Sequence, residues 1–160
     1  MKPAASRTST AAHRRRNGTT VLQTAMVMPA LLIVSMGMVE FGQFLYIKQA
    51  FQAAARYAAR AASLPSATNQ TVQDGATKGL GQANVSLDTS WLTMNDISPD
   101  GSSTTSVTDV TSIPSGDRVQ IQISTTYDQI PNAMRPLYQI FGKGIGPGKP
   151  MVGTCTMVKE

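Results

Sequence analysis

VLQTAMVMPALLIVSMGMV, residues 21–39, is the most apolar stretch of the chain. Its only polar side chains are those of Gln23, Thr24 and Ser35. A bilayer core is crossed by about 20 such residues in a helix. Pro29 would cost about 3 kcal/mol inside a helix in water. It is tolerated in lipid, where no water competes for the backbone hydrogen bonds. The sequence therefore predicts a transmembrane helix.

Two other interpretations compete with a membrane span. A buried core helix of a soluble protein would need other elements to surround it. The chain has 160 residues, of which 14% are charged and 6% aromatic, and so offers few elements that could surround such a helix. A removable signal peptide has an apolar region of about 7–15 residues. The observed run is longer and continues into an alanine-rich segment, which favours a retained span.

The basic residues of the chain are concentrated before the span. Five of the 14 Lys and Arg residues lie within residues 1–18, with no acid among them; the remaining nine balance the nine Asp and Glu residues. A cluster such as Arg14, Arg15 and Arg16 beside a span predicts a cytoplasmic N-terminus and an exported remainder. A nucleic-acid-binding protein would instead spread its cations over a folded face, so no nucleic-acid partner is expected.

The helix is predicted to continue beyond the membrane. Residues 48–62, KQAFQAAARYAARAA, contain eight alanines, and alanine is the best helix former. Ala50, Ala54 and Ala58 recur on one face, and we expect these small residues to let another subunit's helix approach closely. The predicted helix runs from about Val21 to about Ala62, because the residue before Pro65 is disfavoured in a helix.

Glu40 and several aromatic residues lie near the outer end of the predicted span. An ionisable group inside a membrane is costly and usually functional. The position of Glu40 favours a carboxylate that reaches interfacial water, with a subunit contact as the alternative. The aromatic residues expected at this interface are Phe41, Phe44, Tyr46 and Phe51.

Residues 65–160 are predicted to form a small α+β head with an antiparallel sheet. Asn69–Leu80 fits a short helix with one apolar face. Arg118–Tyr127 alternates apolar and polar residues as a strand does, and Met151–Val158 is expected to be a final strand paired with an earlier one. Residues 130–141 suggest one or two helical turns. A turn is expected at Asp100-Gly101 and a short strand near Val107.

The sequence offers few parts for catalysis. There is one histidine, His13, and one cysteine, Cys155. No nucleophile elbow, P-loop or zinc-binding motif is present. The acids are scattered without the paired context of an acid/base site. We therefore expect no enzymatic activity, with no catalytic, cofactor-binding or metal-ligating residues and no small-molecule substrate.

Two segments carry a family resemblance. Arg14-Arg15-Arg16-Asn17-Gly18, followed by TTVLQTAMVMP, resembles the leader junction of type IV-like prepilins, in which a peptidase cuts after the glycine. The segments EFGQFLY, residues 40–46, and QAFQAAARYAARAA, residues 49–62, resemble the TadE/TadG-like family, which contains pseudopilin-like proteins of the tight-adherence (Tad, or Flp) pilus system.

The resemblance implies an organisation and a set of partners. Residues 1–18 would be a basic leader, 19–47 a transmembrane helix, 48–64 its extracytoplasmic continuation and 65–160 the head. Prepilin peptidase would cut between Gly18 and Thr19. Gln23 stands where that family commonly has glutamate, and Pro29 fits one branch of it. An amide can accept a hydrogen bond from an amine but does not neutralise its charge.

The function implied is that of a pseudopilin or minor pilin-like structural component of pilus assembly or a related secretion apparatus. Its partners would be membrane lipid, prepilin peptidase and other pilus or pseudopilin subunits. The protein would lie in the bacterial inner membrane, which it would cross once, or on the pilus and cell surface. The alternative is a signal-anchored extracytoplasmic binding domain that does not assemble, in which Gly18 is incidental.

Overall fold

The computed structural model describes residues 10–130, 142 and 148–160, with side chains from residue 20 onward. The chain divides into two units, Met1–Val39 and Glu40–Glu160. The second unit is called the head here. The helical turns expected within residues 131–141 lie outside the described residues.

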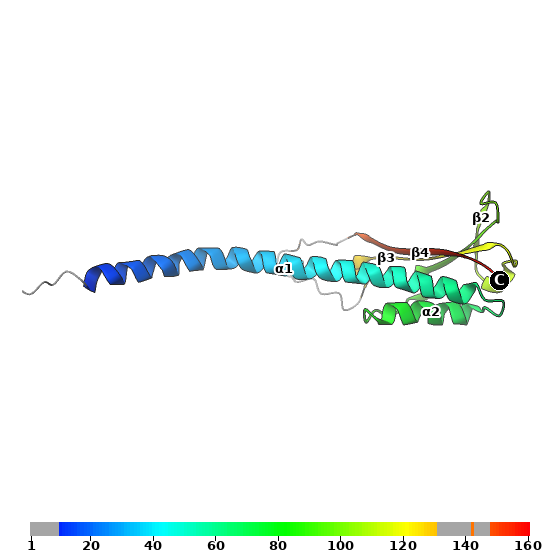
Figure 1. Cartoon of the computed structure of the whole chain (residues 1–160), viewed down its shortest axis with the longest axis horizontal. Coiled ribbons are helices and arrows are strands. Elements are labelled where there is room, and N and C mark those ends of the chain that lie inside the picture. Colours follow the sequence, from blue (N-terminus) through cyan, green and yellow to red (C-terminus); the bar gives the residue numbers. More distant parts are fainter. Residues whose placement is uncertain (1–9, 131–141, 143–147) are drawn as a thin grey trace, which may run out of the picture. The chain divides into compact units, whose positions relative to one another are not determined.

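Helix α1 spans Thr10–Ala62 and contributes to both units (Figure 1). It begins eleven residues before the expected start near Val21, because the preceding Ala and Arg residues are themselves good helix formers. It continues through Pro29. It ends at Ala62, as predicted from Pro65, and the Ser63 N–H closes the last turn by donating to the Ala59 carbonyl at 3.0 Å.

Helix α2, Asn69–Gly81, confirms the predicted short helix. Thr68 caps it: the Thr68 hydroxyl accepts from the Thr71 N–H, and the Thr71 hydroxyl accepts from the Thr68 N–H. Such a reciprocal cap satisfies two amide groups that the first helical turn leaves unpaired. The buried face is formed by Val72, Ala76, Gly79 and Leu80.

Four antiparallel strands form one sheet in the order β2-β1-β3-β4. The strands are β1 Leu92–Ile97, β2 Thr104–Val107, β3 Arg118–Thr126 and β4 Pro150–Val158. The expected strands at 118–127, near Val107 and at 151–158 are therefore present, and the α+β class is confirmed. Gly101 takes a φ of 75° in the predicted turn between β1 and β2, a conformation that glycine adopts at little cost.

Strand β1 was missed by sequence reasoning. Leu92 and Met94 lie opposite Ile123 and Ile121 of β3, on the face that carries the buried residues. The third position on that face is Asp96, opposite Val119. This acid interrupts the apolar alternation on which a strand prediction depends.

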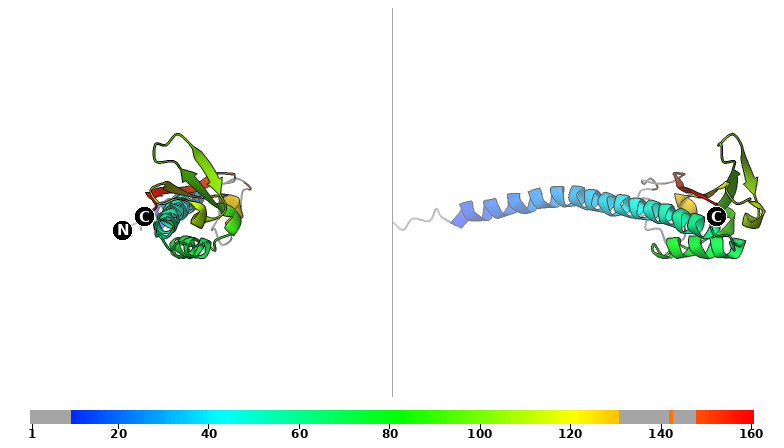
Figure 2. Two further views of the ribbon diagram at one scale, coloured as in Figure 1. Left: turned by 90° about the vertical axis from the view of Figure 1, so that its right-hand side faces the viewer. Right: turned by 45° about the vertical axis from the view of Figure 1, so that its right-hand side comes forward.

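Within the head, residues 40–62 of α1 lie between α2 and the sheet (Figure 2). The core is formed where the three layers meet. Its largest fully buried apolar side chains are those of Tyr127, Phe51, Leu80, Ile121, Ile123 and Met151.

Candidate membrane and assembly surfaces

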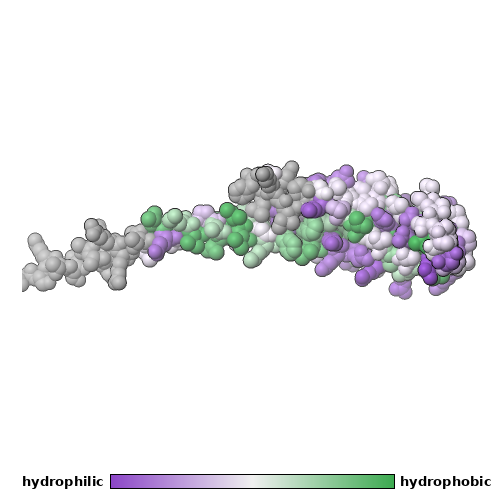
Figure 3. All heavy atoms as spheres, turned by 90° about the horizontal axis from the view of Figure 1, so that it is seen from above, coloured by the Kyte–Doolittle hydropathy of each residue, from purple (hydrophilic) through white to green (hydrophobic). Residues whose placement is uncertain are grey.

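The apolar part of α1 before the head is exposed along its length. Eleven of the large apolar side chains from Val21 to Val39 are between 47% and 76% exposed, whereas Met36 is half-buried. Figure 3 shows hydrophobic residues gathered on this part of the helix. Such exposure in water would be strongly unfavourable. Nineteen helical residues measure about 28 Å, close to the thickness of a bilayer core. By length and composition this helix is a candidate membrane span.

The polar side chains of this segment differ in how they are satisfied. The Thr24 hydroxyl donates to the Thr20 carbonyl at 2.9 Å, and the Ser35 hydroxyl donates to the Leu31 carbonyl at 2.6 Å. Both hydroxyls are therefore already hydrogen-bonded within the helix. The Gln23 side chain is exposed and makes no hydrogen bond with the described part of the chain. In lipid an amide without a partner is costly, so a partner from beyond the described residues would stabilise the Gln23 side chain in a span.

The expected processing junction lies within α1. The structure places the backbone of Arg14, Arg15, Arg16, Gly18 and Thr19 in this helix. A peptidase that holds its substrate extended would have to unwind this turn, and Gly18 lowers the cost because glycine weakens a helix by about 1 kcal/mol. Cleavage after Gly18 stays a prediction.

Glu40 does not occupy the expected environment. Its side chain is fully buried, so the expectation that the carboxylate reaches interfacial water is wrong. The physical reason is that the head begins at Glu40, inside the segment 19–47 that was expected to cross the membrane. From this turn onward, the packing of the head covers one side of α1.

Phe51 is also placed differently from the expectation of an interfacial aromatic residue. It is fully buried, and its ring centroid lies 6.1 Å from that of Trp91. Phe44 is half-buried and meets the Tyr127 ring edge-on at 5.5 Å. Phe41 and Tyr46 are about half exposed, in keeping with an interfacial position.

The small residues of α1 do bring a second helix close, but that helix belongs to the same chain. Ala50 is 5% exposed, and Ala54 and Ala58 are fully buried. A Cβ added at Gly79 of α2 would overlap the backbone of Ala54. The expected docking of another subunit on Ala54 and Ala58 is therefore wrong, because α2 already covers them.

Strand β4 makes an equally close approach to α1. A Cβ at Gly153 would overlap the Phe51 carbonyl. Beside it, the Gln52 amide donates to the Thr154 carbonyl at 2.9 Å and accepts from the Thr154 N–H at 3.4 Å. Gln52 thus satisfies both backbone groups of a residue on an edge strand. Sequence reasoning missed this role, since no local signal identifies the strand that Gln52 meets.

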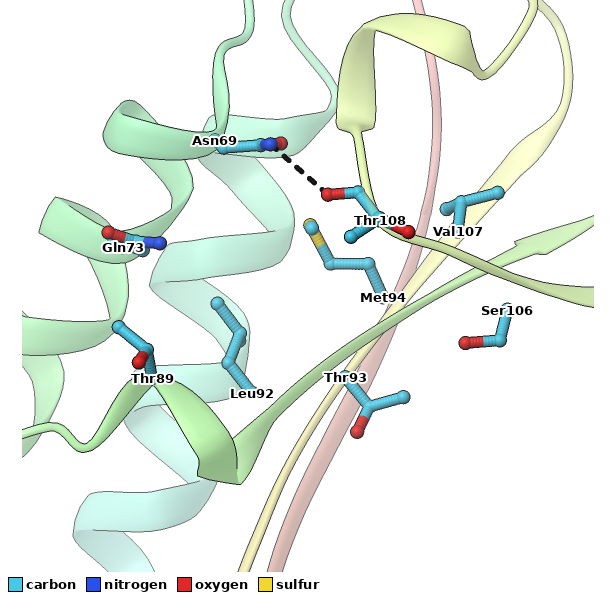
Figure 4. A pocket seen from close by; sticks show the side chains of 9 residues that line it. All are labelled: Asn69, Gln73, Thr89, Leu92, Thr93, Met94, Ser106, Val107 and Thr108. Atoms are coloured by element: carbon cyan, nitrogen blue, oxygen red, sulfur yellow. Dashed lines mark hydrogen bonds between the residues drawn. The ribbon is translucent and has the colours of Figure 1, made fainter.

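The cavity shown in Figure 4 lies between α2 and strands β1 and β2. Its volume is about 370 Å³, and its lining consists of neutral side chains. Asn69 closes one end: its amide donates to the Thr108 carbonyl at 3.1 Å and accepts from the Val110 N–H at 2.9 Å. Because none of the lining residues is titratable, this cavity supplies no general acid or base.

Three exposed carboxylates cap turns of the head. Asp88, Asp100 and Asp109 each accept a hydrogen bond from the backbone N–H two residues later, at 2.9–3.0 Å. These backbone hydrogen bonds are the main cause that lowers the pKa of each carboxyl below its ordinary value. All three are therefore ionised at neutral pH. Among the described residues, no group of three or more His, Cys, Asp or Glu side chains could hold a metal ion.

In a comparison with known proteins, residues 18–60 match the family model described as TadE-like protein. The match covers the junction glycine, the exposed span and most of the buried alanine segment. It confirms the resemblance predicted from the sequence. No curated protein and no solved structure is significantly similar to the chain. The TadE-like segment and the exposed apolar helix together indicate a membrane-anchored protein related to the Tad pilus system.

Proposed function

We propose that this chain is a pseudopilin-like structural subunit of tight-adherence pilus assembly, or of a related secretion apparatus, without enzymatic activity. The observation that carries the proposal is that one helix combines an exposed apolar segment with an alanine segment buried in the head. Residues 21–39 of α1 are apolar and exposed, whereas the alanines that follow are buried in the head. The TadE-like match spans both parts.

The proposed location is the bacterial inner membrane, crossed once, with the N-terminus in the cytoplasm and the head outside. Arg14, Arg15 and Arg16 support this orientation, because basic residues beside a span stay on the cytoplasmic side. Prepilin peptidase would then meet the Gly18–Thr19 junction on that side. Mature subunits would contact other subunits of the apparatus through the span.

Gln23 is the residue of the span best suited to such a contact. Its amide has no partner in the described part of the chain, and interhelical hydrogen bonds of this kind are worth about 1 kcal/mol in membranes. A carboxylate at this position would also neutralise a neighbouring terminal amine. Because Gln23 carries no charge, we propose that the subunit incorporates weakly, as a minor or initiating component.

Mass spectrometry of the mature N-terminus tests the proposal. A mature chain beginning at Thr19, with Gly18→Leu blocking cleavage, supports the pseudopilin. A chain that keeps Met1 supports the alternative, a signal-anchored domain that does not assemble. A chain beginning beyond Ala62 would identify a secreted protein.

Crosslinking in the membrane tests the assembly part of the proposal. We expect Gln23→Leu to lower the crosslinked fraction with pilus subunits several-fold, and Gln23→Glu to raise it. Thr24→Val is the matched control, because the Thr24 hydroxyl is already bonded within its own helix. Equal crosslinking for all three variants would contradict a role of the span in assembly.

A further inference from the structure

The cavity between α2 and strands β1 and β2 exists because β2 is shorter than β1 (Figure 4). Val107, the last residue of β2, lies opposite Met94. Leu92 therefore pairs with Ile123 of β3 on one side and, among the described residues, with no strand on the other. The first turns of α2 line the space that this leaves, which measures about 370 Å³. The cavity is thus a consequence of the sheet topology.

The lining of this cavity offers hydrogen-bonding groups that the protein itself does not use. Within the described part of the chain, the Gln73 amide and the hydroxyls of Thr89 and Thr108 form no hydrogen bond. Figure 4 shows Gln73 and Thr89 on the same side of β1 as the apolar side chains of Leu92 and Met94. A ligand in the cavity therefore meets free donors and acceptors beside an aliphatic surface.

The charges around the cavity favour an uncharged ligand. None of the lining side chains is charged. Asp88 directly precedes Thr89, Asp109 directly follows Thr108, and both carboxylates are exposed and ionised. An anion would approach these two negative charges with no cation in the lining to offset them. A cation would find no carboxylate in the lining, because Asp88 and Asp109 each accept from the backbone N–H two residues later.

The shape of the cavity favours a compact ligand over an extended peptide. Asn69 joins α2 to the segment after β2, because its amide donates to the Thr108 carbonyl at 3.1 Å and accepts from the Val110 N–H at 2.9 Å. A peptide strand needs a groove that is open at both ends, and this bridge closes one of them. The volume of about 370 Å³ lies near the lower end of the range for small-molecule sites. It equals the share of about twelve water molecules in the liquid, which leaves room for one hexose ring.

We propose that this cavity binds a single neutral hexose unit, such as the terminal sugar of a glycan. Sugar hydroxyls both donate and accept hydrogen bonds, as do the Gln73 amide and the Thr89 hydroxyl. The C–H face of the ring packs on Leu92 and Met94, in the combination of apolar surface and few polar groups that is usual for small-molecule sites. The inference goes beyond the proposed function, because sugar binding needs the folded head and neither cleavage nor assembly.

NMR of the methionine methyl groups tests the inference on the full-length chain. The nine methionines are labelled, and Met94→Leu identifies the Met94 signal. The chain is held in a polyoxyethylene detergent, because this carries no sugar headgroup. At least one of D-glucose, D-galactose and D-mannose is expected to shift the Met94 signal saturably. The uronate of the same hexose, in which a carboxylate replaces the C6 hydroxymethyl group, is expected to bind at least about tenfold more weakly.

Two pairs of variants assign the binding to the cavity. Gln73→Leu is expected to weaken sugar binding about tenfold, because the sugar loses a hydrogen-bonding partner. Gln70→Leu is the matched control: its side chain lies on the same helix, exposed and outside the lining, and binding should be unchanged. Thr89→Val keeps the shape of the side chain but removes the hydroxyl, and should weaken binding several-fold. Thr104→Val, at an exposed position of β2 outside the lining, is its control.

The outcomes are distinct. A Met94 signal that none of the three hexoses shifts, or a uronate that binds as tightly as its hexose, overturns the inference. Binding that is unchanged in both Gln73→Leu and Thr89→Val overturns it too, as does equal loss in Gln73→Leu and Gln70→Leu while Trp91 fluorescence shows a folded head. None of these results touches the mature N-terminus or the Gln23 crosslinks, which decide the proposed function separately.

Discussion

Gly79 shows how one absent methyl group sets the distance between two helices. A side chain there would collide with the backbone of Ala54, and backbone cannot rotate away as a flexible side chain can. The neighbouring Gly81 lies in the same helix, with nothing within 4 Å of its missing Cβ. The two glycines thus separate the effect of packing from the effect of helix propensity.

We predict that Gly79→Ala lowers the free energy of unfolding of the head by about 2 kcal/mol, the usual cost of overpacking a core. Gly81→Ala should leave it unchanged or raise it by up to about 1 kcal/mol, because alanine favours the helix. Urea titration followed by the fluorescence of Trp91, the single tryptophan, measures both. Equal destabilisation by the two variants would contradict the close contact of α2 with α1.

At the scale of elements, α1 protects one edge of the sheet and leaves the other open. Gln52 pairs with both backbone groups of Thr154 on β4. An unpaired edge invites pairing with other chains, and the Gln52 amide fills the place of a neighbouring strand at this point.

We predict that Gln52→Leu speeds hydrogen exchange of the Thr154 amide about tenfold, because the loss of about 1.4 kcal/mol of local stability multiplies the open population by that factor. Gln52→Glu should have a smaller effect, since a carboxylate still accepts from the Thr154 N–H but cannot donate to the Thr154 carbonyl. Amides in the centre of β3 serve as the internal control. Unchanged exchange at Thr154 in both variants would show that the pair contributes nothing.

At the scale of the whole molecule, the capped turns link stability to pH. Asp88, Asp100 and Asp109 have a lower pKa folded than their ordinary value of 3.8. Each binds fewer protons when folded, so its contribution to stability is complete above about pH 4 and is lost as the pH falls through the folded pKa.

We predict that the free energy of unfolding of the head is level near neutral pH and falls as the pH drops below about 4. Replacing the three aspartates with asparagine should make this fall shallower, because asparagine caps a turn without titrating. Urea titrations at several pH values, on the wild type and the triple variant, provide the measurement. Parallel pH profiles would mean that other carboxyl groups control acid unfolding.

The sequence by itself determined the long helix, its end at Ala62, the helix at 69–80 and the strand at 118–127. These depend on local properties: apolar composition, alanine content, the proline at 65 and alternation in β3. The TadE-like resemblance likewise rests on a contiguous segment. Each of these signals is complete within a short window of sequence, which is why no tertiary information was needed.

The tertiary structure decided which surfaces are free. Ala54 and Ala58 resembled an assembly face in the sequence, yet α2 occupies that face because Gly79 permits contact. Glu40 resembled an interfacial carboxylate, yet the head covers it. Strand β1 was hidden by Asp96 and is defined by its pairing with β3. Whether a small or charged side chain meets a partner, lipid or its own chain depends on residues distant in sequence, and only the packed fold brings those together.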